Sequence, residues 1–188
     1  FNAGVNAATI HVQQYTKGTE ITLGGEKGAP SFMVSALYPT NGRLVLTNDD
    51  VGKLNAKQEL LIGNEKTGNV TVAGKVDAGN KNVSITTGKD LYMNYAFNTT
   101  GSLVASGSCG DNNFYIGSGN LDGFSSMVIN GKGGNDALYL NDSGNSTGNT
   151  YNINALGVHR LASATSPALT IGFNQSNKNW YNSVNHLS

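Results

Sequence analysis

The chain lacks several features that mark particular classes of protein. It has a single cysteine, Cys109, among 188 residues, which excludes an internal disulfide framework. Charged residues make up only 13% of the chain, and 12 Lys and Arg balance 12 Asp and Glu, so no net charge attracts nucleic acid or an anionic membrane surface. Its apolar runs fall short of the roughly 18 residues that a membrane-spanning helix needs. We therefore expect neither nucleic-acid binding nor membrane insertion.

Catalytic motifs are missing as well. His11, His159 and His186 stand in unrelated sequence contexts, without a nucleophile elbow, an HExxH pair or a phosphate-binding loop. The acidic residues are mostly isolated from one another, so the sequence does not indicate the convergent carboxylates of a glycosidase. We expect that the protein is not an enzyme.

Uncharged polar residues are what the chain has in abundance. It contains 25 glycines and many Asn, Ser and Thr residues, a composition more typical of secreted and cell-surface β-proteins than of cytosolic enzymes. The sequence opens at Phe1 without a methionine or an apolar signal segment, as it would after cleavage of a signal peptide. We expect a secreted protein that is extracellular or lies at the cell surface.

Short apolar segments predict that nearly the whole chain is β. Their β-branched and aromatic residues suit strands, and the Gly, Asn and Asp between them suit tight turns. The exception is Asp49–Glu59, where Asn48 is a candidate N-cap and Val51 and Leu54 fall near one helical face, although Gly52 weakens a helix. The predicted strands are Ile10–Tyr15, Glu20–Leu23, Phe32–Tyr38, Arg43–Thr47, Glu59–Ile62, Asn69–Ala73, Asn82–Thr86, Leu91–Ala96, Leu103–Ala105 and Ala168–Phe173.

Four further segments between Asn113 and Ile153 alternate apolar and polar residues and recur every 11 to 13 residues. Alternation of this kind buries one face of a strand. The regular spacing favours a β-solenoid, whereas an antiparallel β-sandwich or jelly roll remains the alternative. In either case we expect one all-β domain over residues 1–188. The apolar pairs are Phe114 and Ile116, Met127 and Ile129, Leu138 and Leu140, and Tyr151 and Ile153.

The segment Gly117–Ile153 resembles a repeat of very large secreted bacterial surface proteins. The repeat has the form GNLD, a strand, a Gly-rich turn with N-D, another strand, and a D-x-G turn that ends in G-N-T-Y. The resemblance implies a β-helical fold and an adhesin-like or structural role at the surface. The matching residues are Gly119, Asn120, Leu121, Asp122, Gly131, Gly134, Asn135, Asp136, Leu138, Asp142, Gly144, Gly148, Asn149, Thr150 and Tyr151.

One turn suggests calcium. The stretch Gly131–Tyr139 approaches the G-G-x-G-x-D-x-U-x nonapeptide, in which turn carbonyls and an aspartate bind Ca²⁺. It departs from that motif at Lys132, where the motif has glycine, and it occurs once. We take Asp136 as a candidate Ca²⁺ ligand, with Asp122 and Asp142 as further candidates. The alternative is that these aspartates bond to the backbone of their own turns.

Two tyrosines are candidates for an exposed aromatic site. Tyr115 and Tyr139 alternate with residues that we expect to point inward, so we expect both to face outward. Aromatic side chains on stacked strands can form a ladder, which would suit either sugar binding or contact between subunits.

The N-terminal stretch is a candidate for assembly. Within residues 1–23 the apolar positions Ile10, Val12, Ile21 and Leu23 could complete the sheet of a neighbouring copy, or this stretch could be the domain's own first strand. A weakly charged surface does not repel its copies, and open β edges must be paired or capped. The four aspartates of 103–142, followed by a segment without acids, would also favour head-to-tail contacts.

These features together predict a structural subunit of an extracellular filament or surface lattice. It would self-assemble with copies of itself through β-strand or head-to-tail contacts. The alternative is a glycan-binding adhesin domain whose partners are cell-surface glycans. We expect no cofactor other than Ca²⁺.

Overall fold

A computed structural model describes residues 5–13, 17–24, 43–146, 148–173 and 186–187, and this part of the chain is mostly β. The predicted strand Phe32–Tyr38 lies outside the described residues. The strands are β1 (Val5–Val12), β2 (Glu20–Leu23), β3 (Arg43–Leu46), β4 (Leu54–Gly63), β5 (Val70–Val72), β6 (Val76–Asp77), β7 (Asn82–Thr86), β8 (Leu91–Met93), β9 (Phe97–Asn98), β10 (Leu103–Ser106), β11 (Asn113–Ile116), β12 (Met127–Asn130), β13 (Ala137–Leu140), β14 (Tyr151–Asn154), β15 (Gly157–Arg160), β16 (Leu169–Phe173) and β17 (His186–Leu187).

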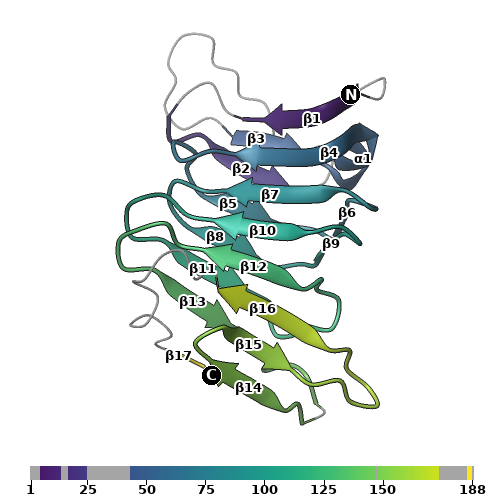
Figure 1. The fold of residues 1–188 in the computed structure, drawn as a ribbon, viewed down its shortest axis with the longest axis vertical. Helices are drawn as coiled ribbons and strands as arrows, with labels where there is room; N and C mark the ends of the chain where they lie inside the picture. Colours follow the sequence, from purple (N-terminus) through teal and green to yellow (C-terminus); the bar gives the residue numbers. More distant parts are fainter. Residues whose placement is uncertain (1–4, 14–16, 25–42, 147, 174–185, 188) are drawn as a thin grey trace.

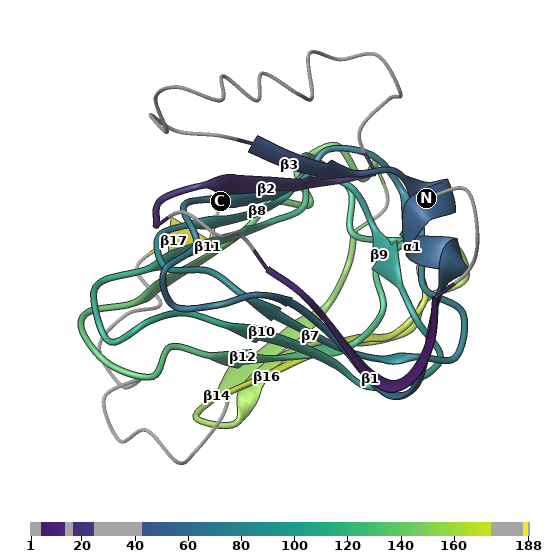
Figure 2. The same cartoon turned by 90° about the horizontal axis from the view of Figure 1, so that it is seen from above.

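The strands form two large sheets that face each other and a third, small one (Figures 1 and 2). One sheet has the order β1-β4-β7-β10-β12-β16-β15-β14, the second β17-β13-β11-β8-β5-β2-β3, and the third pairs β6 with β9. Between β4 and β13 the chain alternates between the two large sheets and returns to each after 20 to 24 residues. Among the described strands, all pairs are parallel except β14 with β15 and β15 with β16. The alternative of an antiparallel sandwich therefore does not describe these sheets.

Alternating apolar residues of both large sheets fill the space between them. In the second sheet, Ile21, Val70, Leu91, Phe114 and Leu138 follow one another across the strands, and each is at most 1% exposed. Such rows bury the apolar face of every rung against its neighbours, as a continuous core requires. The predicted inward positions of β11, β12 and β13 are therefore confirmed.

Asparagine and aspartate side chains join successive rungs at the corners. Asn82 Oδ1 accepts the backbone N–H of Ser102 at 3.0 Å, and Asp111 Oδ1 accepts that of Asn135 at 2.8 Å. These side chains satisfy backbone donors where the sheet hydrogen bonds end. Glycine is needed where the turn bends most. Gly63 has φ +76°, and a Cβ there would collide with the carbonyl oxygen of Thr86.

The predicted helix is real but shorter than expected. Helix α1 spans Asn48–Lys53, and its N-cap is Thr47 rather than Asn48. The Thr47 hydroxyl accepts the N–H of Asp50 at 3.1 Å, while the Asp50 carboxylate accepts the N–H of Thr47 at 3.0 Å. From Leu54 onward the chain enters β4, because pairing with β1 and β7 uses the residues that we assigned to the helix.

The C-terminal end of the first sheet departs from the prediction. Ile153 follows the apolar alternation but is 46% exposed, while Tyr151 is partly buried against the core. The reason is the position of β14, which is the last strand of its sheet in the described part of the chain and pairs with β15 alone. An edge strand has neighbours on one side, so an inward-pointing residue there can remain exposed.

Candidate functional site

Three tyrosines occupy equivalent positions on neighbouring strands of the second sheet. Tyr115 on β11 pairs in register with Tyr92 on β8 and with Tyr139 on β13. The residues on either side of each tyrosine are buried, so the tyrosines project from the outer face and are partly exposed. We call Tyr92, Tyr115 and Tyr139 the tyrosine row. The expected outward orientation of Tyr115 and Tyr139 is what the structure has.

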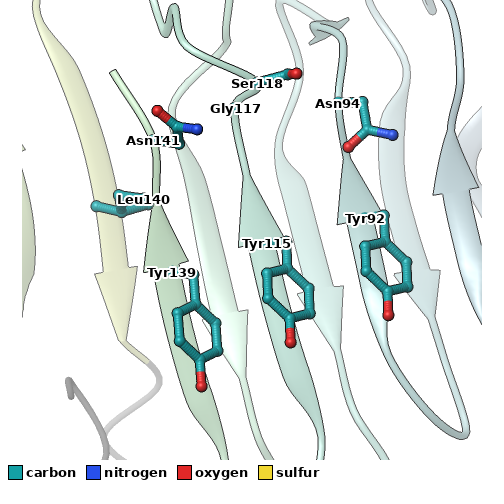
Figure 3. Close-up of a pocket in the computed structure, with 8 residues that line it drawn as sticks. All are labelled: Tyr92, Asn94, Tyr115, Gly117, Ser118, Tyr139, Leu140 and Asn141. Carbon is teal, nitrogen blue, oxygen red and sulfur yellow. The ribbon is translucent and has the colours of Figure 1, made fainter. Parts of the chain in front are cut away.

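The rings of the tyrosine row stack on one another. Ring centroids lie 4.9 Å apart for Tyr92 and Tyr115, with 1° between the planes, and 4.7 Å apart for Tyr115 and Tyr139, with 10° between them. These spacings equal the distance between paired strands, so the sheet itself sets the stacking. Figure 3 shows the three rings side by side, with their hydroxyl groups pointing the same way along the strands.

Sequence reasoning missed Tyr92, although a signal for it exists. The tripeptides Leu91–Met93, Phe114–Ile116 and Leu138–Leu140 each place a tyrosine between two apolar residues, at intervals that match one return to the same sheet. A tripeptide pattern that recurs once in each return to the same sheet places its central side chains in one row.

Asp90 supports one end of the row. Its Oδ2 accepts a hydrogen bond from the Tyr92 hydroxyl at 3.3 Å, and its Oδ1 accepts the backbone N–H of Asn113 at 3.0 Å. Burial, reinforced by the charge of Asp90, raises the pKa of both Tyr92 and Tyr115. A tyrosine phenol is already neutral near pH 7, and these shifts move the ionisation of Tyr92 and Tyr115 further from that pH.

A shallow hollow of about 350 Å³ lies over the tyrosine row. Asn94, Ser118 and Asn141 follow the rings toward the C-terminal ends of the strands and carry polar groups to its border (Figure 3). None of the lining side chains carries a formal charge. The lining residues are Tyr92, Asn94, Tyr115, Gly117, Ser118, Tyr139, Leu140 and Asn141.

The three candidate calcium ligands do not form one cluster. Among the described residues no group of three His, Cys, Asp or Glu side chains is placed to hold a metal ion. Asp136 is buried, with Oδ1 accepting the backbone N–H of Asn112 at 2.9 Å. Burial raises the pKa of Asp136 to about 7; the hydrogen bond from Asn112 lowers it and the charge of Asp111 raises it further. Asp136 therefore bonds to backbone, but to that of the preceding rung rather than to its own turn as the alternative expected.

Asp122 and Asp142 flank Arg160 instead of a metal. The buried guanidinium of Arg160 lies 2.9 Å from Asp122 Oδ1 and 3.2 Å from Asp142 Oδ2. Burial alone would raise the pKa of Asp142, but hydrogen bonds from Tyr151, Leu121 N–H and Asn149 and the charge of Arg160 lower it. The single positive charge of Arg160 offsets part of the negative charge of two of the four aspartates, and this weakens the charge gradient that we expected to favour head-to-tail contacts.

The apolar residues proposed for assembly belong to the chain's own core. Ile21 and Leu23 are fully buried, Ile10 is 8% exposed, and Val12 packs partly against them. Strand β1 pairs with β4, and β2 pairs with β3 and β5 of the same chain. Because these side chains pack in the chain's own core, they are not free to complete the sheet of another copy.

Comparisons with known protein families, with characterised proteins and with solved structures find no match. In the residues that the structure describes, no helix has the length and apolar character to cross a membrane.

Proposed function

We propose that the chain is a β-solenoid subunit of an extracellular filament or surface lattice, and that it assembles head-to-tail with copies of itself. The solenoid assignment is supported by the parallel pairing and by the regular return of the chain to each sheet. In such folds each rung contacts only its neighbours, so the two ends of the stack resemble interrupted sheets.

The observation that carries this proposal is the direction of the edge strands. Strand β1 runs parallel to β4, β7, β10, β12 and β16, and two antiparallel steps through β15 bring β14 back to that same direction. In the second sheet, β3 and β17 also share one direction. A copy stacked on the end of another would therefore continue both sheets with parallel pairing.

Strand β1 carries none of the side chains that usually protect an edge, although its pairing with β4 shifts register once, between Ala7 and Thr9. Its eight residues, Val5–Val12, include no lysine, proline or acid, and β14 is equally free of them. Natural edge strands commonly carry charges or prolines that prevent pairing with another chain. The contact joins two different surfaces, and a contact of that type produces a filament when its rotation does not close a ring.

Electron microscopy and sedimentation of the purified protein over a range of concentrations test this proposal. We expect oligomers that lengthen with concentration and have a long axis along the strand stack. A protein that stays monomeric at the highest concentrations would contradict it.

A second candidate function, a glycan-binding adhesin domain, is favoured by a separate observation. The tyrosine row and its hollow are not part of the edge contacts and offer aromatic and amide groups to a ligand. Secretion to the outside of a bacterial cell is part of both proposals.

A further inference from the structure

We infer that the tyrosine row binds a neutral polysaccharide chain that lies along the row, across β8, β11 and β13. The inference rests on the second candidate function and names its ligand class and its site. It does not depend on self-assembly.

The first support is that the aromatic surface is formed before a ligand arrives. Tyr115 is held between Tyr92 and Tyr139 by stacking on both sides, and strand pairing fixes the backbone beneath all three. Rings that are already ordered lose little conformational freedom on binding. Because each ring stacks on its neighbour, the row presents the ring edges side by side as one continuous apolar strip. The apolar C–H face of a sugar ring can pack against this strip.

The second support is the arrangement of polar groups on the two flanks of the rings. The tyrosine hydroxyls lie toward the N-terminal ends of the strands, and Asn94, Ser118 and Asn141 lie beyond the other flank (Figure 3). A polysaccharide presents hydroxyl groups around the rim of each apolar face. Donors and acceptors on both flanks can bond those hydroxyls while the rings contact the face between them.

The third support is charge. The eight lining residues carry no formal charge, and the phenols of Tyr92 and Tyr115, whose pKa values are raised, are neutral near pH 7. Among the described residues, the lining offers no cation to a uronate, a sulfated sugar or a nucleic-acid phosphate, each of which needs Lys or Arg for strong binding. Asp90, hydrogen-bonded to Tyr92 and Asn113, adds a negative charge that disfavours anionic chains.

The size of the site sets the length of ligand. The hollow of about 350 Å³ lies near the lower end of the range usual for ligand sites, and the row presents three rings in line. A single sugar can contact only part of this row. We therefore expect affinity to rise with chain length until the ligand spans all three rings, and then to level off.

Calorimetric titration with soluble oligosaccharides of one to six units tests the inference. Neutral glucans, xylans and mannans are the probes, and oligogalacturonate is the acidic comparison. We expect at least one neutral series to bind, with an affinity that does not fall as sodium chloride is raised. Tyr115→Ala should weaken that binding about tenfold or more, since it removes the middle of the apolar strip against which the sugar packs.

Tyr95→Ala is the matched control. Tyr95 is 54% exposed and is not among the lining residues, so its loss removes a surface tyrosine without touching the site. Asn141→Ala tests the polar flank and keeps all three rings, and it should also weaken binding. Thermal unfolding of each variant shows whether the fold is retained.

Three results would overturn the inference. They are failure of every neutral series to bind the wild-type protein, equal loss of binding in Tyr95→Ala and Tyr115→Ala, and salt-sensitive binding of oligogalacturonate alone. If Tyr115→Ala instead abolished oligomers seen by electron microscopy, the row would be a subunit contact and the glycan site would be refuted. Oligomers that persist in a protein with no glycan binding would leave the self-assembly proposal standing.

Discussion

At the scale of single residues, the buried carboxyl group of Asp136 should give the protein an unusual pH dependence. Its pKa is raised from 3.8 to about 7 in the folded chain, chiefly by burial. The folded state therefore keeps a proton that the unfolded state releases, and stability from this group falls as pH rises from about 4 to about 7 and is constant above. The difference across that window is at most about 4 kcal/mol.

Asp136→Asn should remove this loss. An amide keeps an oxygen to accept the N–H of Asn112 and has no charge to desolvate. In urea unfolding at pH 5 and pH 8, the free energy of unfolding of the variant relative to the wild-type protein should be higher at pH 8 than at pH 5. Asp77→Asn, at an exposed carboxyl, is the control. An identical change with pH in wild type and Asp136→Asn would refute the assignment.

Arg160 is the second residue whose effect can be predicted. Its side chain is buried, lies near the carboxylates of Asp122 and Asp142, and donates to the carbonyl oxygen of Pro167 at 3.0 Å. Arg160→Met keeps much of the apolar stem but leaves two carboxylates without their cation, and we expect a loss of about 3–5 kcal/mol in the free energy of unfolding.

A double-variant cycle separates charge from packing. Adding Asp142→Asn to Arg160→Met should recover part of the loss, because it removes one of the two unpaired charges. Denaturant unfolding of the two single variants and the double variant measures the recovery. Strictly additive losses would mean that packing of Arg160, rather than its ion pairs, stabilises this end of the sheet.

At the scale of elements, helix α1 depends on its cap. A helix of six residues has few hydrogen bonds of its own, so the reciprocal bonds between Thr47 and Asp50 are a large part of what holds it. Thr47→Ala should lower the free energy of unfolding by about 1 kcal/mol, measured by denaturant titration. Ser146→Ala, an exposed loop position, should change it little. Equal effects of both substitutions would contradict the capping role.

Strands could be predicted from the sequence where apolar and polar residues alternate within the strand itself. Alternation located β2 and β7 at their observed bounds and correctly identified the inward residues of β11 to β13. Local patterns failed where long-range pairing decides the structure. Leu54 begins β4 instead of extending the helix because β1 pairs with that stretch. Strand β15 was missed because its short segment, Gly157–Arg160, shows no apolar alternation.

The candidate site was predictable in part for the same reason. The outward position of Tyr115 and Tyr139 follows from strand alternation, which is local. That Tyr92 joins them depends on the number of residues in each return to the sheet, which becomes visible only when the rungs are aligned. The pairing of Asp122 and Asp142 with Arg160 could not be predicted, since it joins residues of different strands and turns across the end of the stack.

At the scale of the whole molecule, the parallel stack produces both proposed surfaces. Equal directions of successive strands align identical positions into rows, of which the tyrosine row is one. The edge strands at the two ends of each sheet also run in one direction, so an end of one copy can pair in parallel with the opposite end of another. The strands that carry the tyrosine row, β8, β11 and β13, lie along the side of the stack, and the edge strands β1 and β14 lie at its two ends (Figure 1). Substitutions at one surface should leave the other unchanged.

The edge of β1 gives the sharpest test of assembly. Thr9 is exposed on β1 and pairs in register with Glu59 of β4, so a lysine at position 9 gains an opposite charge within its own chain and should not destabilise the monomer. It also places a charge on an edge that the proposal requires to pair with β14 of another copy. Thr9→Lys should raise the concentration needed for oligomers about tenfold, measured by sedimentation.

Asn80→Lys is the matched control for this prediction. It adds the same charge at an exposed turn between β6 and β7, away from both ends of the stack, so it changes net charge without changing an edge. If general repulsion between charged copies limited assembly, both variants would raise the required concentration equally. If copies pair through the edge of β1, only Thr9→Lys should raise the required concentration, and the melting temperature of the monomer should stay unchanged. Assembly that tolerated Thr9→Lys would mean that the copies join through another surface, because a charged edge disfavours the parallel pairing on which head-to-tail growth depends.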